Sequence, residues 1–187
     1  LFAVLVFSTA LAAMADSFRW IANKNHCAAY LAYALYYIFI PIPSLAALYL
    51  SSYLSKGGEM LSKRRMFTGI AVYAGMFILN IVNLVVPCLF YLDENNTFQR
   101  GPLNIAYNIC VILILVLTIF RVYKDKSEYI LKILRLQLFW LAPMITGIIQ
   151  LVFDDVDIYI AGLTISIFIY YISLQAKTLR LDYLTGA

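Results

Sequence analysis

Six long apolar runs, separated by short polar breaks, leave this chain few ways to fold. They cover approximately residues 1–15, 28–54, 66–92, 103–122, 130–153 and 158–176. A helix needs about 20 consecutive apolar residues to cross the hydrocarbon core of a bilayer. The runs are continuous and lack the two-residue alternation of barrel strands, so we expect each of them to form a helix.

Composition supports a membrane protein. Of the 187 residues, 64% are hydrophobic and 13% are charged, with a mean hydropathy of +0.85. Soluble domains are about half apolar and about a quarter charged. The predicted fold is therefore all-α, a polytopic transmembrane helix bundle with six spans, which leaves no room for a sizeable soluble domain.

Basic residues in the breaks predict the orientation, because cytoplasmic loops are enriched in Lys and Arg. One alternating set of breaks and the C-terminus hold eleven basic residues: Lys56, Lys63, Arg64, Arg65, Arg121, Lys124, Lys126, Lys132, Arg135, Lys177 and Arg180. The other set holds three: Arg19, Lys24 and Arg100. We therefore expect a multi-pass protein of the plasma (inner) membrane with a cytoplasmic C-terminus, whose basic loop at residues 63–65 contacts anionic lipids.

Amide side chains inside the spans are the informative polar residues. Asn80 and Asn83 share a helix face at i, i+3, Asn104 and Asn108 lie at i, i+4, and Gln150 lies near the end of the fifth run. Except for Asn80, all are expected in the outer half of the bundle. Polar groups in hydrocarbon are costly and face the protein interior. Interhelical hydrogen bonding is the simpler interpretation. An outward-opening ligand pocket is the alternative, with Tyr30, Tyr33, Trp20 and Trp140 as its aromatic walls.

Other features favour structural roles. His26 and Cys27 cannot complete a four-ligand zinc shell, so we expect neither a metal site nor a catalytic site. The cysteines at positions 27, 88 and 110 are expected to be small buried residues. Pro41 and Pro43 remove backbone donors and should kink or unwind the second run. Basic charge is divided among several loops, which argues against nucleic-acid binding.

The end of the chain carries a recognisable motif. Asp182-Tyr-Leu-Thr-Gly186 resembles the D-x-L-T-G entrance of GGDEF domains, the catalytic module of bacterial diguanylate cyclases. The resemblance implies a parent protein that condenses two GTP into cyclic di-GMP, with Mg²⁺ as cofactor and dimerisation required. It also implies seven spans in that parent. Residues 1–176 would then form a sensory bundle, itself non-catalytic, and residues 177–187 a signalling helix and the start of the GGDEF domain.

Signal output is expected through the last helix, in response to an external or membrane-soluble small molecule. Leu174, Leu181 and Leu184 have a spacing consistent with a short parallel helix pair in a homodimer, although Lys177 interrupts it. The predicted output residues are Leu174, Leu181, Asp182, Leu184, Thr185 and Gly186. Two alternatives stay open: the sensor region of a histidine kinase or another receptor, and a small transporter or channel with a span broken at Pro41 and Pro43.

Overall fold

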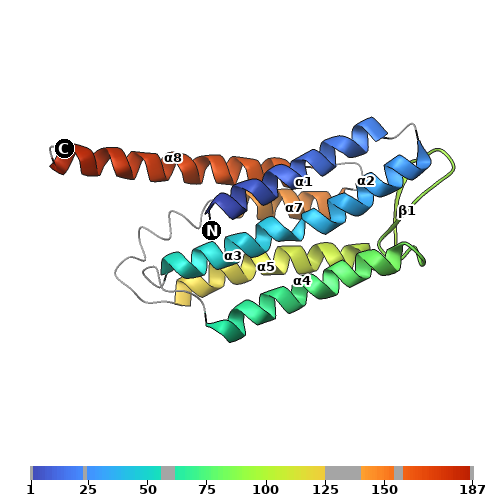
Figure 1. Ribbon diagram of the computed structural model, residues 1–187, viewed down its shortest axis with the longest axis horizontal. Helices are drawn as coiled ribbons and strands as arrows, with labels where there is room; N and C mark the ends of the chain where they lie inside the picture. Colours follow the sequence, from blue (N-terminus) through green and yellow to red (C-terminus); the bar gives the residue numbers. More distant parts are fainter. Residues whose placement is uncertain (1, 23–24, 56–61, 125–139, 154–157, 186–187) are drawn as a thin grey trace.

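The computed structural model describes residues 2–22, 25–55, 62–124, 140–153 and 158–185. Most of these residues are helical and pack as a bundle (Figure 1). The helices are α1 (Phe2–Ala22), α2 (His26–Phe39), α3 (Pro41–Ser55), α4 (Lys63–Asn83), α5 (Asn104–Lys124), α7 (Leu141–Val152) and α8 (Tyr159–Thr185). Strands β1 (Phe90–Leu92) and β2 (Phe98–Arg100) pair antiparallel as a hairpin. The predicted helical class is thus confirmed apart from this hairpin.

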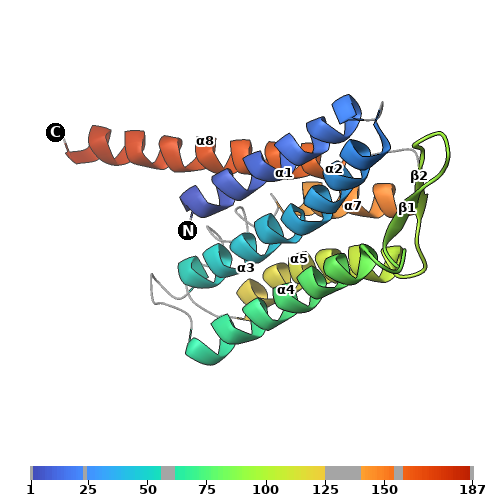
Figure 2. The ribbon, with the colours of Figure 1, turned by 45° about the vertical axis from the view of Figure 1, so that its right-hand side comes forward.

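Helices α2 and α3 form the central rod of the bundle. Ile40 separates them but keeps helical dihedral angles (φ −58°, ψ −36°), and its amide donates to the Tyr36 carbonyl at 2.9 Å. Pro41 then opens α3 and has no amide hydrogen to donate to the Tyr37 carbonyl, which accepts from the Tyr107 hydroxyl instead. The predicted disruption is therefore a boundary between two helices that continue one another (Figure 2).

The remaining helices pack around this rod. Helices α1 and α5 contact it directly, and α7 contacts α8 and α5. Small side chains permit close approach, since Ala12 on α1 and Ala29 and Ala47 on the rod are completely buried. Helix α4 contacts α2 and α3 but leaves a wide apolar face exposed, with Phe67 at 71% and Ile78 at 57% exposure. An exposed apolar face of this extent suits contact with lipid rather than water.

Three helical stretches of the described residues are long and apolar enough to cross a membrane: Phe2–Ala22, His26–Tyr53 and Met66–Asn83. Shorter apolar stretches accompany them at Asn104–Phe120, Leu141–Val152 and Tyr159–Ile172. These findings support the predicted transmembrane helices. The number of six spans stays a prediction.

Three predicted segment ends are wrong, one of them at residue 176, since α8 continues to Thr185. The first helix continues to Ala22 instead of ending at residue 15. The third was expected to reach residue 92, but α4 ends at Asn83 and the chain turns into β1. Proline at position 87 cannot donate a helical hydrogen bond, and the Asn83 side chain binds the backbone of the following loop instead. Residues 130–139 of the fifth segment lie outside the described residues.

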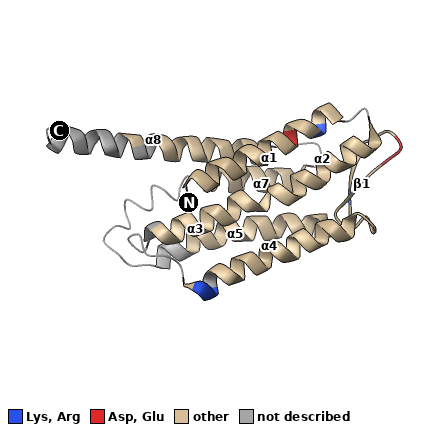
Figure 3. Ribbon diagram, viewed as in Figure 1, with Lys and Arg blue, Asp and Glu red and all other residues tan. Residues whose placement is uncertain are grey.

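The bundle has two distinct ends. The end of α1, the start of α2, the β1–β2 hairpin and the last turn of α7 lie together at one end, called the hairpin end below (Figures 1 and 2). Lys63 and Arg64 begin α4 at the opposite end (Figure 3). Helix α8 starts beside the last turn of α7 and runs unbroken for 27 residues, projecting past the other helices (Figure 1). The predicted domain boundary at residue 176 falls within it.

Candidate functional site

Asn83, the last residue of α4, organises the hairpin end. Its side-chain oxygen accepts from the backbone amides of Leu89 at 2.6 Å and Phe90 at 3.2 Å. Its side-chain nitrogen donates to the Phe90 carbonyl and to the Tyr30 hydroxyl, both at 3.1 Å. The Tyr30 hydroxyl in turn donates to the Asn83 carbonyl at 2.6 Å. The buried amide therefore has partners on both of its polar atoms, as a polar group in an apolar bundle requires.

Asn104, the first residue of α5, holds the same loop from the other side. It is 1% exposed, and its side-chain nitrogen donates to the Leu89 carbonyl at 2.9 Å and the Tyr37 hydroxyl at 2.6 Å. Asn108 donates its side-chain nitrogen to the Asn104 side-chain oxygen at 2.9 Å. Three of the predicted amides therefore hold the connection between α4 and α5 in place.

Aromatic side chains from α2 enclose Phe90, which is completely buried. The Phe90 ring stacks on Tyr37 at 5.3 Å between centroids and lies 5.0 Å from Tyr30 and 5.7 Å from Tyr33. Phe98, from the second strand, stacks on Tyr33 at 5.0 Å. Tyr30 and Tyr33, which were predicted to form the walls of a ligand pocket, therefore pack around side chains of the hairpin.

Gln150, in the last turn of α7, makes hydrogen bonds to α2, α8 and β2. Its side-chain nitrogen donates to the Tyr36 hydroxyl of α2 at 3.1 Å, and its side-chain oxygen accepts from the Tyr159 amide at the start of α8 at 3.0 Å. From the hairpin, Arg100 donates to the carbonyls of Gln150 at 2.7 Å and Leu151 at 2.9 Å. A cation at a helix C-terminus is stabilising, because the last carbonyls lack helical partners and carry partial negative charge.

Tyr159 extends this connection into the core. Its hydroxyl is hydrogen-bonded to the Ser44 hydroxyl of α3 at 2.6 Å, and both side chains are buried. A continuous set of hydrogen bonds thus runs from Arg100 on β2, through the last turn of α7, to the first residue of α8 and the central rod.

Arg19 is a functional candidate that the sequence analysis missed. The count of basic residues places Arg19 in an external break, whereas it lies in the last turn of α1, is 6% exposed and forms an ion pair with Asp16. Its guanidinium lies over the rings of Tyr36 at 3.9 Å and Tyr33 at 5.0 Å. The i, i+3 spacing of Asp16 and Arg19 in an otherwise apolar stretch was a usable signal for a paired charge inside a helix.

Asn80, Trp20 and Trp140, the other predicted site residues, do not join the hydrogen-bonded and aromatic residues of the hairpin end. Asn80 is 3% exposed, and neither side-chain polar atom has a hydrogen-bond partner among the described residues. Trp20 is 77% exposed on α1, and Trp140 is buried at the start of α7, at the far end of that helix from Gln150. The structure thus brings together Asn83, Asn104, Asn108, Gln150, Tyr30 and Tyr33 at the hairpin end.

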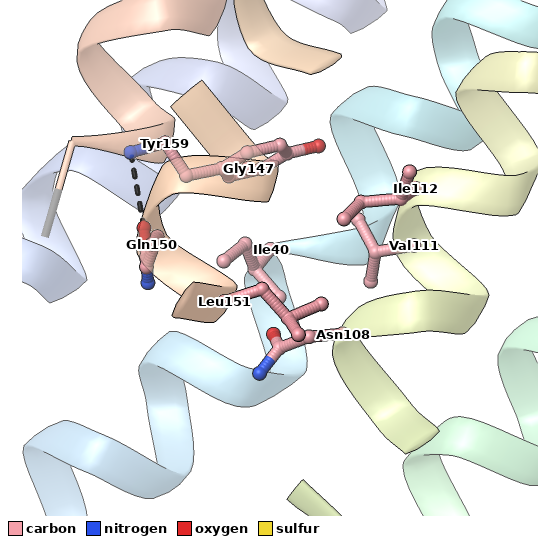
Figure 4. A pocket seen from close by; sticks show the side chains of 8 residues that line it. All are labelled: Ile40, Asn108, Val111, Ile112, Gly147, Gln150, Leu151 and Tyr159. Atoms are coloured by element: carbon pink, nitrogen blue, oxygen red, sulfur yellow. Dashed lines mark hydrogen bonds between the residues drawn. The ribbon is translucent and has the colours of Figure 1, made fainter. Parts of the chain in front are cut away.

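A small cavity lies beside this cluster, with a volume of about 10 Å³, which is roughly room for one water molecule. Two predicted residues, Asn108 and Gln150, contribute to its wall (Figure 4). The full lining is Ile40, Asn108, Val111, Ile112, Gly147, Gln150, Leu151 and Tyr159. None of these side chains is charged, so the space suits a neutral group.

Asp93 shapes the tip of the hairpin. Its carboxylate accepts from the backbone amides of Asn95 at 2.9 Å and Thr97 at 2.8 Å and from the Thr97 hydroxyl. These bonds stabilise the charged form and lower the pKa of Asp93. Asn96 adopts a positive φ of 60°, and its side-chain oxygen lies 2.7 Å from Nδ1 of His26. The tip is therefore tied to the start of α2.

Within the described part of the chain, no three His, Cys, Asp or Glu residues are grouped to hold a metal ion. Of the cysteines, Cys88 is buried, whereas Cys27 and Cys110 are exposed, so the expectation that all three are buried is wrong for two of them. Both lie on the outer surface of their helices, and thiols are apolar enough to face lipid.

Five of the six predicted output residues lie in the second half of α8. The backbone from Leu174 to Thr185 is helical. The side chains of Leu174, Leu181, Asp182, Leu184 and Thr185 lie outside the described part of the structure, as does Gly186 entirely.

A comparison with protein-family models, curated proteins and solved structures finds no match to this chain.

Proposed function

We propose that this chain is a membrane sensory domain that regulates a diguanylate cyclase domain following it. The observation on which the proposal rests is the single helix α8, which begins at the hydrogen-bond cluster of the hairpin end and continues to the D-Y-L-T-G motif. A rigid helix that joins a packed cluster to an output motif can transmit a shift of either one to the other. The cyclase would use GTP and Mg²⁺, and its catalytic residues would belong to that following domain.

The sensing step needs a ligand that binds two packings of the bundle with different affinity, since a ligand with equal affinity for both changes nothing. The hydrogen bonds that Gln150 and Tyr159 make between α7, α8 and the central rod offer a physical basis for two packings. Rotation or sliding of α8 would break two hydrogen bonds of Tyr159 and let its amide and hydroxyl form new ones. The two bonds are the one from its amide to Gln150 and the one between its hydroxyl and that of Ser44. The parent acts as a homodimer, because two nucleotide-loaded domains must meet.

The finer topology is part of the same proposal: six spans in the plasma (inner) membrane, with the C-terminus in the cytoplasm. The described basic residues Lys63 and Arg64 lie at the end of the bundle opposite the hairpin, as this orientation requires. Reporter fusions after residues 57, 96 and 187 test it. An extracytoplasmic reporter signal at 96, and cytoplasmic signals at 57 and 187, are expected; the reverse pattern would refute the orientation.

The activity is tested on the full-length gene product purified in membrane nanodiscs. Incubation with GTP and Mg²⁺ is expected to yield cyclic di-GMP, and Leu181→Asp is expected to uncouple that activity from the bundle. If the gene encodes no nucleotide-cyclising domain after residue 187, or the product makes no cyclic di-GMP, the cyclase proposal fails. Unchanged activity and regulation in the Leu181→Asp protein would refute the coupling through α8.

A further inference from the structure

The segment Leu89–Phe90 is held as a peptide ligand would be. Both of its backbone amides donate to the Asn83 side-chain oxygen, at 2.6 and 3.2 Å. The Phe90 carbonyl accepts from the Asn83 side-chain nitrogen at 3.1 Å, and the Leu89 carbonyl accepts from Asn104 at 2.9 Å. Two buried asparagines therefore bind both amides and both carbonyls of two consecutive residues.

The Phe90 side chain occupies an aromatic box. Three tyrosines of α2, at positions 30, 33 and 37, contact its ring at centroid distances of 5.0 to 5.7 Å, and the Tyr37 ring is nearly parallel to it at 9°. Aromatic pairs in such arrangements are favoured over contacts of equal area with aliphatic groups. The box is therefore selective for a planar ring.

Most of the binding groups and the occupant belong to different parts of the fold, although the Leu89 carbonyl also accepts from the Gly101 amide of the same connection at 2.9 Å. The box and the two asparagines are contributed by α2, the end of α4 and the start of α5. The occupant is part of the connection between α4 and α5. None of the side chains that contact Leu89 or Phe90 in these ways is charged, so the site suits a neutral group.

We propose that this Phe90 site is a ligand site that the chain's own hairpin occupies, and that a free ligand of the same class competes for it. That class is a neutral molecule with an aromatic ring next to a peptide-like amide. The regulatory meaning of the site rests on the proposed sensory function, whereas binding itself requires no cyclase domain.

Displacement of Phe90 would have a defined consequence. Phe90 is paired with Arg100 across the hairpin, and Arg100 binds the last carbonyls of α7. A ligand that removes Phe90 from the box therefore loosens the hairpin and, through Arg100, the turn of α7 that holds the first amide of α8.

The first test uses N-acetyl-L-phenylalaninamide as the probe, with the full chain in nanodiscs and calorimetric or NMR detection of binding. The wild type is expected to bind it, and Phe90→Ala is expected to bind it at least about tenfold more tightly, because the internal competitor is gone. N-acetyl-L-leucinamide should bind Phe90→Ala clearly more weakly. Phe67→Ala, which removes an exposed phenylalanine from α4, should bind the probe as the wild type does.

Hydrogen exchange supplies the second readout. Saturation of the wild type with the probe is expected to speed amide exchange across residues 89–100, whereas binding elsewhere on the surface would leave it unchanged. If Phe90→Ala does not fold, Phe90→Leu replaces it with the same expectation of tighter binding than wild type.

The proposal is overturned if the variant binds the probe no more tightly than wild type, if the leucine analogue binds equally well, or if the wild type shows no faster exchange with probe. Because none of these measurements involves nucleotide chemistry, a failed cyclase assay leaves the outcome intact, and failure here leaves the cyclase proposal intact.

Discussion

The side chain of Asn83 binds both backbone polar groups of Phe90, accepting from its amide at 3.2 Å and donating to its carbonyl at 3.1 Å. This arrangement ends α4 and places the first strand of the hairpin in the bundle. It also explains why a buried amide is tolerated in an apolar segment: three of its four side-chain hydrogen bonds satisfy backbone groups of the loop, and the fourth goes to the Tyr30 hydroxyl.

We expect Asn83→Leu to destabilise the protein by roughly 1–3 kcal/mol, because the buried amides of Leu89 and Phe90 lose their acceptor. Asn80→Leu is the matched control on the same helix. Since Asn80 has no hydrogen-bond partner among the described residues, its replacement should be neutral or stabilising. Unfolding in mixed micelles measures both. Equal losses of stability in the two variants would contradict the assigned role of Asn83.

Arg100→Gln should weaken the last turn of α7 and the first turn of α8. Arg100 donates to two carbonyls of α7 with a full charge, and glutamine can neither make both bonds in the same fork nor supply the charge. Faster hydrogen exchange is expected at residues 148–153 and 159–162. Arg64→Gln, at an exposed position at the other end of the bundle, serves as the control and should leave these amides unchanged. Identical exchange in the two variants would rule out the connection from Arg100 to α8.

Gly162→Ala should disrupt the contact between α7 and α8. A methyl group at this position would meet the Ala142 carbonyl oxygen and the Pro143 Cα at 3.0 Å, and backbone atoms cannot move aside locally. We expect a loss of stability of about 1–3 kcal/mol from this overpacking. Gly75→Ala, where no atom outside the local helix backbone lies within 4 Å of the new methyl group, should be neutral or slightly stabilising in α4. Thermal unfolding of both variants in the same detergent measures these changes in stability. If Gly162→Ala is as stable as the wild type, α7 and α8 do not pack as closely as the structure shows.

The tip of the hairpin should depend on pH through Asp93. Its pKa is lower in the folded protein than in the unfolded chain, because the charged carboxylate accepts three hydrogen bonds. The stabilisation is therefore complete above the unfolded pKa of about 3.9 and is lost as the pH falls through the lower, folded value.

NMR signals of the Asn95 and Thr97 amides report this titration directly. In Asp93→Asn the acidic transition should disappear, whereas in Glu94→Gln it should persist. A transition that survives Asp93→Asn would assign it to another group.

Sequence reasoning reached the membrane class and the helical elements because both follow from hydrophobic runs, which need no partner to be recognised. It also singled out the buried amides, since a polar side chain in an apolar run needs a partner wherever it lies. It missed the hairpin because residues 84–92 are almost as apolar as the helix before them. It missed Arg19 because a charge near the end of a run was assigned to a loop.

The sequence by itself determined that this chain is largely helical and apolar enough to enter a membrane, and it predicted partners inside the bundle for its amides, which Asn83, Asn104, Asn108 and Gln150 have and Asn80 lacks among the described residues. Only the tertiary structure decided what satisfies them: the backbone of the chain's own hairpin, and the first amide of α8. The reason is physical. Hydrophobic periodicity depends on neighbours a few positions away, whereas the partners of Asn104 and Gln150 include Tyr37 and Tyr36, 67 and 114 positions away along the chain. Such pairings arise only when the helices pack.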